Sequence, residues 1–265
     1  MRRPLLHLPL AVLFAVSWLV AAARTGPVAT AQEVSRLVTV QQSGVLRVCT
    51  TGDYPPYTLR EDDAYRGVDI TLASDLAATL HVVPQWIPTT WSTLTDDFLA
   101  QCDIAVGGIS DTTARRQVAD FSIPTSIDGK TPVTRRADAD TYATIDQINR
   151  PEVRVIVNRG GTNEAFARTN FPEAQLTIWP DNLTIYDQLE QHRADVFVTD
   201  SVEGRYRQRT HPTLQVLHPD TPFDSAAKAY LLPKGDVLFN TVVNTWLESA
   251  IRSGRADQLL ADWIG

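Results

Sequence analysis

The sequence predicts an α/β fold of two lobes, each built on a parallel sheet covered by helices. Short apolar strands alternate with amphipathic helical stretches, which is typical of parallel sheets. The alternation occurs twice, and an extended segment at residues 129–134 separates the two occurrences. A second crossover is expected at residues 222–226, ahead of one more strand and a C-terminal helix. We therefore expect the last part of the chain to return to the first lobe.

The first occurrence of the pattern predicts strands at 45–48, 82–87 and 104–106 and a helix at 93–100. Between the first two strands, Val68, Leu72, Leu76 and Leu80 recur at helical spacing. The second occurrence predicts strands at 153–157, 176–178 and 196–198 and helices at 163–169, 183–192 and 202–209. A last strand at 229–232 leads into a helix that carries Val242, Val243, Trp246, Leu247 and Ile251.

These elements assign lobe 1 to residues 37–132 and 226–265 and lobe 2 to residues 133–225. In open α/β sheets, ligands bind at the carboxyl ends of the strands. A cleft between two lobes is also the default position for a small-molecule site. We therefore look for functional residues where predicted strands end and face this cleft.

Residues 1–31 have the features of a secretory signal peptide. Met1-Arg2-Arg3 is basic, residues 5–23 are largely apolar, and Ala29-Thr30-Ala31 offers the small residues that a signal peptidase reads. We expect cleavage before Gln32 or, alternatively, after residue 23. A transmembrane anchor is the other interpretation, because the apolar run is close to the roughly 17 residues that span a bilayer. We favour an exported protein, periplasmic or secreted, without a stable membrane anchor.

Composition narrows the class of partner to small molecules. Roughly 230 residues remain after the signal, enough for two modest lobes. The formal net charge is -7 and no basic run occurs, so nucleic acid is not an expected partner. The five His are scattered without CxxC or HxxxH spacing, so no metal site is expected. No feature of the sequence indicates an oligomeric state.

The two cysteines, Cys49 and Cys102, could form a disulfide or remain free thiols. In an exported protein a pair of cysteines suggests a disulfide. However, Cys49 lies at the end of one predicted strand, whereas Cys102 precedes another. Such ends point apart in parallel neighbours, and a bridge needs Cα atoms within about 7 Å. We therefore expect two buried free thiols.

A first candidate site follows the strand at 104–106. Gly107-Gly108-Ile109-Ser110 lets a ligand approach the backbone. Arg115, which precedes Phe121-Ser122 by six residues, offers a planar fork for a carboxylate, although an isolated Arg is more often a solvated helix residue. The string resembles the periplasmic type 2 solute-binding fold, as in amino-acid-binding proteins of ABC importers. That resemblance implies that Arg115 holds a ligand carboxylate, and we expect Ser110 to bind substrate beside it.

Aromatic residues follow the first predicted strand, where such clefts bind ligands. Asp53 and Tyr54 lie in the segment Thr50-Thr51-Gly52-Asp53-Tyr54-Pro55-Pro56-Tyr57. The ring of Tyr54 can pack on a ligand ring, or the segment can be a Pro-rich turn with core tyrosines. Trp91 precedes a predicted helix, and it either forms a wall of the cleft or packs in the core.

Two further strand ends lie in the second lobe. Asn158-Arg159-Gly160-Gly161-Thr162-Asn163 forms a strand end, a turn and a helix start, and Thr199-Asp200-Ser201-Val202-Glu203 forms another such junction. Both are places where α/β sheets bind anions and hold catalytic groups. A binding protein has use for the turn and for Asp200 but no evident need for Glu203. Taken alone, Glu203 is more often a surface acid favoured by the helix dipole.

Several motifs together resemble one family, the exported cyclohexadienyl dehydratases. The resemblance extends from about residue 37 to the C-terminus. The motifs are Thr50-Thr51-Gly52-Asp53-Tyr54, Asp128-Gly129-Lys130-Thr131-Pro132, Asn158 with Gly160-Gly161-Thr162-Asn163-Glu164, Phe166-Ala167-Arg168, Pro180-Asp181-Asn182 with Thr184-Ile185, Thr199-Asp200 with Glu203, and Lys228-Ala229-Tyr230-Leu231-Leu232-Pro233. The resemblance implies decarboxylative dehydration of prephenate to phenylpyruvate and of arogenate to phenylalanine, without a cofactor. It also implies that Glu203 is the carboxylate general acid.

The residue types agree with that chemistry. Loss of the ring hydroxyl as water needs a proton donor that stays protonated near neutral pH, and burial and nearby negative charge raise a Glu pKa. Arg115, Lys130 and the N–H groups at Thr162 and Asn163 are suited to orient the substrate carboxylates. We also expect Asn158 and Gly161 to contact substrate. Asp200 either binds a ligand ammonium or positions a neighbouring group, and Lys228 either lines the site or pairs with an acid.

A non-catalytic amino-acid-binding protein of an ABC importer is the alternative function. The scaffold is the same, so the fold cannot separate the two functions. The distinguishing residues are Glu203, Asn158 and Lys130, which a plain binder does not need. A receptor sensor lobe and a lytic transglycosylase are less favoured, because no further domain follows.

Overall fold

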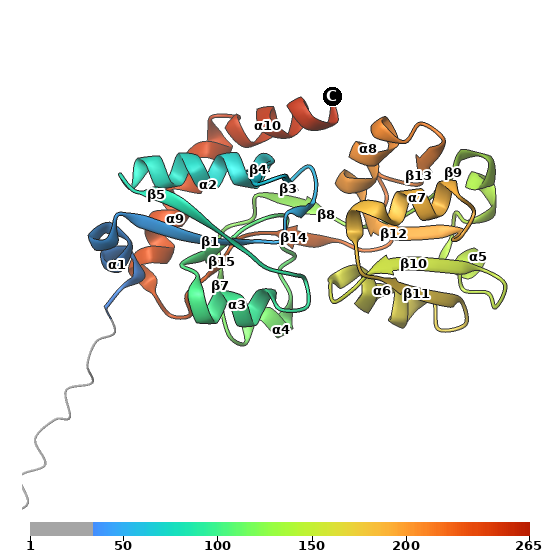
Figure 1. The fold of residues 1–265 in the computed structure, drawn as a ribbon, viewed down its shortest axis with the longest axis horizontal. Coiled ribbons are helices and arrows are strands. Elements are labelled where there is room, and N and C mark those ends of the chain that lie inside the picture. The colour runs from blue at the N-terminus through green and yellow to red at the C-terminus, as the bar shows by residue number, and fades with distance from the viewer. Residues whose placement is uncertain (1–33) are drawn as a thin grey trace, which may run out of the picture. The chain divides into compact units, whose positions relative to one another are not determined.

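The structure, a computed structural model, describes residues 34–265. These residues form one compact unit, drawn in colour in Figure 1. The expected signal peptide at residues 1–31 lies outside the described residues. None of the helices in residues 34–265 is both long and apolar enough to cross a membrane.

The first lobe contains a five-stranded sheet with the order β5-β1-β6-β15-β7. Its strands are β1 (Val45–Thr50), β5 (Val83–Pro88), β6 (Ile104–Ala105), β7 (Asp120–Phe121) and β15 (Leu231–Leu232). Its helices are α1 (Arg36–Ser43), α2 (Val68–Thr79), α3 (Leu94–Gln101), α4 (Thr113–Arg116), α9 (Val237–Arg252) and α10 (Arg255–Ile264). A small antiparallel sheet of β2 (Asp53–Tyr54), β3 (Thr58–Glu61) and β4 (Ala64–Arg66) follows β1.

The second lobe contains another five-stranded sheet, with the order β11-β10-β12-β9-β13. Its strands are β9 (Lys130–Arg135), β10 (Arg154–Asn158), β11 (Gln175–Trp179), β12 (Val196–Asp200) and β13 (Leu214–Val216). Its helices are α5 (Ile145–Ile148), α6 (Thr162–Asn170), α7 (Ile185–Glu190) and α8 (Ser201–Thr210), with short 3-10 segments η1 (Arg136–Thr141) and η2 (Asn182–Thr184).

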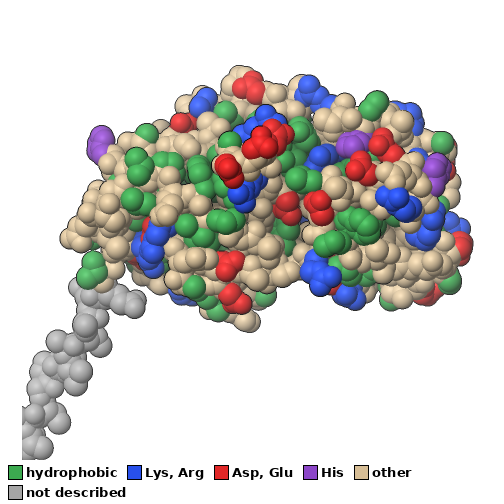
Figure 2. Space-filling model, in the orientation of Figure 1, with side chains coloured by type: hydrophobic (Ala, Val, Ile, Leu, Met, Phe, Trp, Pro, Cys, Tyr) green, Lys and Arg blue, Asp and Glu red, His purple; other side chains and the backbone are tan. Residues whose placement is uncertain are grey.

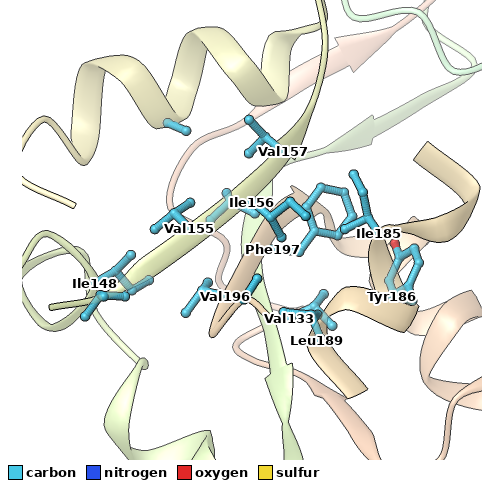
Figure 3. Close-up of a cluster of buried hydrophobic side chains, with 14 of the residues drawn as sticks. Val133, Ile148, Val155, Ile156, Val157, Ile185, Tyr186, Leu189, Val196 and Phe197 are labelled. Carbon is cyan, nitrogen blue, oxygen red and sulfur yellow. The ribbon is translucent and has the colours of Figure 1, made fainter. Parts of the chain in front are cut away.

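Each lobe has its own apolar core, formed where helices pack against its sheet. Figure 3 shows the core of the second lobe, where Phe197 of β12 lies near Ile185 and Tyr186 of α7, and Val155 and Val157 of β10 belong to the same cluster. All five side chains are buried. The β-branched residues of β10 are suited to this two-sided burial, which is typical of central parallel strands. The carboxyl ends of β10 and β12 are thereby held side by side.

The sheets are mixed, whereas the sequence pattern predicts parallel sheets. In the first sheet β15 runs antiparallel to β6 and β7, and in the second β9 runs antiparallel to β12 and β13. Residues 129–134, expected to be a crossover, lie largely within β9, inside the second sheet. A strand that enters from the other lobe arrives from the opposite end of the sheet, which explains its reversed direction.

The two crossovers between the lobes pair with each other. β8 (Ser126–Asp128) and β14 (Ala226–Lys228) form a two-stranded antiparallel ribbon. Lys130 follows the first crossover directly, and Lys228 ends the second. Both lysines therefore lie at the connection between the lobes, and Lys130 is also the first residue of β9 in the second sheet. Two extended hinge crossovers are present, as predicted, but they lie at residues 126–128 and 226–228 instead of 129–134 and 222–226.

The expectation of two free thiols is wrong, because Cys49 and Cys102 form a disulfide with their Cα atoms 5.8 Å apart. Cys102 is the C-cap of α3 and does not extend the line of β6. α3 packs against β1, and this contact brings Cys102, at the C-terminal end of α3, over Cys49 near the end of that strand. The separation falls within the range that a bridge needs.

The C-terminal helix α10 contacts both lobes. It packs on α2 and α9 of the first lobe and on α8 of the second. Trp263 of α10 lies 5.5 Å from Tyr206 of α8 between ring centroids, and its backbone carbonyl accepts a hydrogen bond from Arg209 at 3.0 Å. On the face drawn in Figure 2, acidic and basic side chains of the described residues are interspersed over both lobes.

Candidate active site

A small cavity lies between the lobes, near the carboxyl ends of β6, β10 and β12. Residues of both lobes line it: Tyr54, Trp91, Gly108, Ser110, Asn158, Gly161, Thr162, Asn163, Asn182 and Asp200. Its volume of about 10 Å³ is close to the space of a single water molecule. An adjoining open groove of about 340 Å³ shares Ser110 and Thr162 with the cavity and is bordered by Lys130.

Asp200 is the charged centre of this cavity. It ends β12, begins α8 and is 3% exposed. Its Oδ1 accepts a hydrogen bond from Lys130 Nζ at 2.9 Å, and its Oδ2 accepts one from Lys228 Nζ at 2.7 Å and one from the Tyr54 hydroxyl. Burial alone raises the pKa of Asp200, but the two ammonium groups outweigh burial and hold the pKa well below its usual range. Asp200 is therefore ionised at neutral pH.

Lys130 connects Asp200 to the start of α6. Its Nζ donates to Thr162 Oγ1 at 3.0 Å and to Asn163 Oδ1 at 2.5 Å. Asn163 Nδ2 in turn donates to Asn158 Oδ1 at 2.9 Å. Burial lowers the pKa of Lys130, and the neighbouring Asp200 opposes that effect. This network holds the two amide side chains in fixed orientations at the wall of the cavity.

Lys228 is completely buried, and it connects the lobes through its ammonium group. Besides Asp200, its Nζ donates to Ser110 Oγ of the first lobe at 2.8 Å. The same Nζ lies 5.7 Å from the ring centroid of Tyr54. Of the two interpretations that the sequence leaves open, the structure shows the pairing with an acid: Lys228 pairs with Asp200, which lines the cavity, and does not line the cavity itself.

Aromatic side chains form the wall contributed by the first lobe. The rings of Tyr54 and Trp91 meet edge to face at 5.5 Å between centroids, and Tyr54 stacks on Tyr57 at the same distance. Trp91 Nε1 donates to Asp53 Oδ1 at 3.0 Å, which fixes the indole. A Cβ atom at Gly108 would lie 2.5 Å from both tyrosine rings, so only glycine permits this packing. The wall offers flat apolar surface to a ring-shaped ligand.

Glu203 lies in the first turn of α8 and is completely buried. Its Oε1 accepts a hydrogen bond from Asn182 Nδ2 at 3.1 Å, and its Oε2 accepts one from the Thr199 hydroxyl. Asn182 Nδ2 also donates to the carbonyl of Asp53 at 2.9 Å, across the lobes. Glu203 does not itself line the cavity, but it touches Asn182, which does.

Burial raises the pKa of Glu203 to about 7. The nearby charges of Asp200 and Asp53 contribute to this increase, whereas Arg207, one turn along α8, and the hydrogen bond from Thr199 oppose it. A carboxyl group with a pKa near the working pH is suited to general acid catalysis. Glu203 and Asp200 thus lie three residues apart with their pKa values moved in opposite directions.

Arg115 lies behind Ser110. Its Nη1 donates to the Ser110 carbonyl at 2.8 Å, and burial lowers the pKa of the guanidinium to about 10. Among residues 34–265 no acidic side chain forms an ion pair with it. A partly buried guanidinium that lacks an acidic partner is suited to bind an anionic ligand.

The structure brings most of the predicted site residues together. Those that line the cavity are Tyr54, Trp91, Ser110, Asn158, Gly161, Thr162, Asn163 and Asp200. Lys130 and Asp53 contact members of this set directly. Arg115 and Glu203 lie one contact behind it, against Ser110 and Asn182 respectively. Their roles toward substrate remain predictions.

Sequence reasoning assigned no site role to Asn182 or Thr199, and it placed Gly108 in a glycine turn without predicting its contact with the tyrosines. Asn182 and Thr199 hold the Glu203 carboxyl group, and Gly108 accommodates the tyrosine wall. Asn182 stands in a short 3-10 turn, where hydrophobic periodicity gives no signal. The motif Pro180-Asp181-Asn182, used for the family resemblance, could have identified it.

One group among the described residues has the side chains of a metal site. Asp187, Glu190 and His211 have potential ligand atoms within 4.8 Å of one another. Glu190 already accepts hydrogen bonds from the Thr213 hydroxyl and, at 3.3 Å, from His211. These three residues do not line the cavity between the lobes, so they lie outside the candidate active site.

Comparison with known protein families shows to which family this chain is related. Residues 46–265 match the family model of the bacterial extracellular solute-binding proteins, family 3. This chain belongs to that family. A member in Pseudomonas aeruginosa, cyclohexadienyl dehydratase, is 45% identical over 236 residues, which cover 88% of this chain and 87% of the relative. The resemblance predicted from the motifs is thereby confirmed.

Solved structures of family members agree with the fold. An ancestral amino acid-binding protein, described as a precursor of cyclohexadienyl dehydratase, matches with a TM-score of 0.81 and 30% identity, covering 87% of this chain and 100% of that chain. An ancestral cyclohexadienyl dehydratase matches with a TM-score of 0.55 and 43% identity, covering 87% and 97%. The type 2 periplasmic-binding-protein-like fold predicted from the sequence is confirmed.

Proposed function

We propose that this protein is a cyclohexadienyl dehydratase that converts prephenate to phenylpyruvate and arogenate to phenylalanine. The observation that carries the proposal is the completely buried Glu203, whose pKa is raised to about 7 beside the cavity between the lobes. A plain solute-binding protein has no use for a protonated acid at that position. The 45% identity to a cyclohexadienyl dehydratase supports the same conclusion. We also propose that the protein is exported, in keeping with its extracellular solute-binding family.

The proposed reaction is a decarboxylative dehydration. Glu203 donates its proton to the ring hydroxyl, and the C–O bond breaks with its electron pair leaving on water. The bond between the ring and its carboxylate then breaks, carbon dioxide departs, and the electron pair completes the aromatic ring. General acid catalysis of this kind contributes typically about 10²–10⁴-fold. Glu203 then regains a proton from solvent.

Cations and dipoles hold the two substrate carboxylates in this proposal. Arg115 is a partly buried guanidinium without an acidic partner among the described residues, and Lys130 borders the groove and contacts Asp200 of the cavity. The start of α6, at Thr162 and Asn163, adds the positive end of a helix dipole. Tyr54 and Trp91 flank the ring. Burial, with smaller contributions from the charges of Asp200 and Asp53, raises the pKa of Glu203 and so favours its protonated form.

The test is a phenylpyruvate assay with prephenate, run on wild type beside Glu203→Gln. Gln retains the hydrogen-bonding shape but is not an acid, so we expect turnover to fall by about 10²–10⁴-fold with folding intact. The blank is held near neutral pH, because prephenate aromatises by itself in acid. Turnover of Glu203→Gln close to wild type would contradict the proposed role of Glu203.

The second candidate function is amino-acid binding without catalysis. The TM-score of 0.81 to an ancestral amino acid-binding protein favours it, since the scaffold is shared. The same assay decides between the functions. Wild-type protein that fails to convert either cyclohexadiene but binds a common amino acid saturably would establish the binding function.

A further inference from the structure

Two buried side chains behind the cavity have hydrogen-bond donors without a partner. They are Arg207 of α8 and Tyr186 of α7, which are 8% and 0% exposed. Among residues 34–265, the Nε and Nη2 atoms of Arg207 and the hydroxyl of Tyr186 have no hydrogen-bond partner. A buried donor without an acceptor costs free energy comparable to a lost hydrogen bond. Three such donors in one place therefore need a structural reason.

Arg207 and Tyr186 lie together, and both lie close to Glu203. The guanidinium carbon of Arg207 is 4.7 Å from the ring centroid of Tyr186. Arg207 follows Glu203 by four residues on α8, a spacing that places two side chains on one face of a helix. Burial raises the pKa of Tyr186 most, the charge of Glu203 contributes to this increase, and the charge of Arg207 opposes it. The Tyr186 hydroxyl is thus within electrostatic range of both charged groups.

The surroundings of the Arg207 guanidinium are aromatic rather than acidic. It lies over the rings of Tyr186 and Tyr206, at 4.7 and 5.6 Å from their centroids, and Tyr186 stacks in turn on His211. No acidic side chain of residues 34–265 forms an ion pair with Arg207, whereas Arg205 on the same helix pairs with Asp220. The charge of Arg207 is therefore available to a neighbouring group that becomes negative.

Glu203 becomes negative when it acts as the general acid. In the structure its carboxyl group is held by neutral donors, the Asn182 amide at 3.1 Å and the Thr199 hydroxyl. Loss of the proton leaves a carboxylate that is completely buried. A buried carboxylate is costly unless a cation and hydrogen-bond donors compensate it. Arg207 and Tyr186 can supply both.

We propose that Arg207 and Tyr186 are positioning residues that stabilise the carboxylate formed when Glu203 gives its proton to the substrate. Donors that lack a partner while Glu203 is protonated acquire one as its negative charge develops. Interactions that strengthen in this way favour the transition state over the ground state. Neither residue lines the cavity, so both act through Glu203. This inference rests on the proposed function for its reaction.

Titratable groups from several elements face Glu203 and together decide when it holds its proton. They are Asp53 and Tyr54 of β2, Tyr186 of α7, Asp200 of β12 and Arg207 of α8. The two aspartates favour the protonated form, although Lys130 and Lys228 bind Asp200 and offset its charge. Arg207 has the largest effect in the opposite direction. Removing its charge should therefore make Glu203 a weaker acid that keeps its proton to higher pH.

The experiment measures kcat and KM for prephenate against pH in wild type, Arg207→Gln and Arg207→Lys. A weaker acid transfers its proton less readily, so we expect Arg207→Gln to lower the limiting kcat at low pH by at least about threefold. We also expect kcat to begin its decline at a pH at least about 0.5 units higher than in wild type. Arg207→Lys keeps the charge and should restore both values toward wild type. KM should change by less than about twofold, because Arg207 does not line the cavity.

Two further variants distinguish this role from a structural one. Arg205→Gln removes the same charge from α8, but Arg205 pairs with the exposed Asp220 at 2.6 Å, and we expect kcat and its pH profile to stay at wild-type values. Tyr186→Phe removes only the hydroxyl, and we expect the decline of kcat to move in the same direction as in Arg207→Gln by a smaller amount. A lower kcat in Arg207→Gln with an unmoved pH profile would contradict the proposal.

A titration of Glu203 itself needs no turnover. Carbon-13 NMR follows the carboxyl carbons in protein labelled at glutamate, and the signal that is missing from Glu203→Gln identifies Glu203. We expect a midpoint of about 7 in wild type and one at least about 0.5 units higher in Arg207→Gln. Wild type that converts neither prephenate nor arogenate, together with this difference in midpoint, would contradict the dehydratase proposal and support the role of Arg207.

Equal midpoints in wild type and folded Arg207→Gln would overturn that role. If Arg207→Gln does not fold, the comparison of wild type with Tyr186→Phe decides, since Phe keeps the ring packing of Tyr186. A higher midpoint in Tyr186→Phe would support the stabilisation of the carboxylate, and an unchanged midpoint would overturn it.

Discussion

At the scale of single residues, two acids three positions apart behave in opposite ways. Asp200 has two ammonium partners, and its pKa lies well below the usual range. Glu203 has only amide and hydroxyl hydrogen-bond partners among the described residues, and burial moves its pKa to about 7. Because their surroundings give these two acids different pKa values, one site can hold both a fixed negative charge and a proton donor.

The pKa of Glu203 predicts a pH dependence of turnover. The general acid must be protonated, so kcat for prephenate should be highest below about pH 7 and fall above it. The measurement is the rate of phenylpyruvate formation between about pH 5.5 and pH 9, corrected for spontaneous aromatisation. A flat profile up to pH 9 would mean that another group supplies the proton.

The same pKa predicts a stability effect that is independent of catalysis. Glu203 has a folded-state pKa of about 7 against an ordinary value of 4.5, so the folded state binds the extra proton between these values. Stability should therefore fall as pH rises from about 4.5 to about 7, by about 3 kcal/mol for this group. Urea unfolding of wild type and Glu203→Gln measures the difference. Parallel stability curves for the two proteins would contradict the raised pKa.

At the scale of elements, hydrophobic periodicity located the strand and helix junctions well. The runs at 153–157 and 196–198 correspond to β10 and β12, and the helices expected after them are α6 and α8. Asn158 and Asp200 could be placed at the site for this reason, because the ends of buried parallel strands lie at one edge of a sheet.

Strand direction and side-chain contacts between lobes could not be predicted in the same way. A period of two residues is the same in parallel and antiparallel strands, so β9 could not be recognised as part of the second sheet. Cys102 looked like the approach to β6, although it caps α3. The contact of Lys228 with Asp200 joins residues 28 positions apart. These features depend on tertiary packing rather than on local pattern.

The disulfide that joins two elements predicts a measurable contribution to stability. The bridge between Cys49 and Cys102 spans 53 positions and fastens α3 to β1. Replacing both cysteines by Ser should lower the free energy of unfolding by about 2–4 kcal/mol. Denaturant unfolding of the double variant, beside wild type with and without reductant, measures this. Equal stability of oxidised and reduced wild type would contradict a stabilising bridge.

At the scale of the whole molecule, the structure is a closed arrangement of the lobes. Tyr54 meets Asp200, Asn182 meets the backbone of Asp53, and Gly160 lies against Ser92. The remaining cavity of about 10 Å³ is far smaller than a six-membered ring with its substituents. Substrate must therefore enter while these contacts between the lobes are open, and the groove beside Lys130 is the adjoining open space.

Gly160 provides a test of closure. A Cβ atom there would lie 2.2 Å from Ser92 Oγ and 2.7 Å from Ser92 Cα, across the lobes. We expect Gly160→Ala to raise KM for prephenate by at least about tenfold, because closing would be blocked. Steady-state kinetics with prephenate gives KM directly.

Gly44 supplies the matched control for this change. Its φ of +70° resembles the +78° of Gly160, but nothing lies within 4 Å of its added Cβ. Both Ala variants should therefore lose about 1 kcal/mol of stability to backbone strain. Only the change at Gly160 should affect KM, and an equal KM increase in Gly44→Ala would assign the effect to strain instead of closure.

The lysines that neutralise Asp200 have a further consequence, which follows from their place on the paired crossovers. Lys130 follows the end of β8 by two residues, and Lys228 ends β14, so both stand close to the axis about which two hinged bodies turn. Points near a pivot travel least. The positive charge can thus stay almost stationary while the rims of the cleft swing apart, and an arriving anion meets a fixed electrostatic target before the lobes have closed around it.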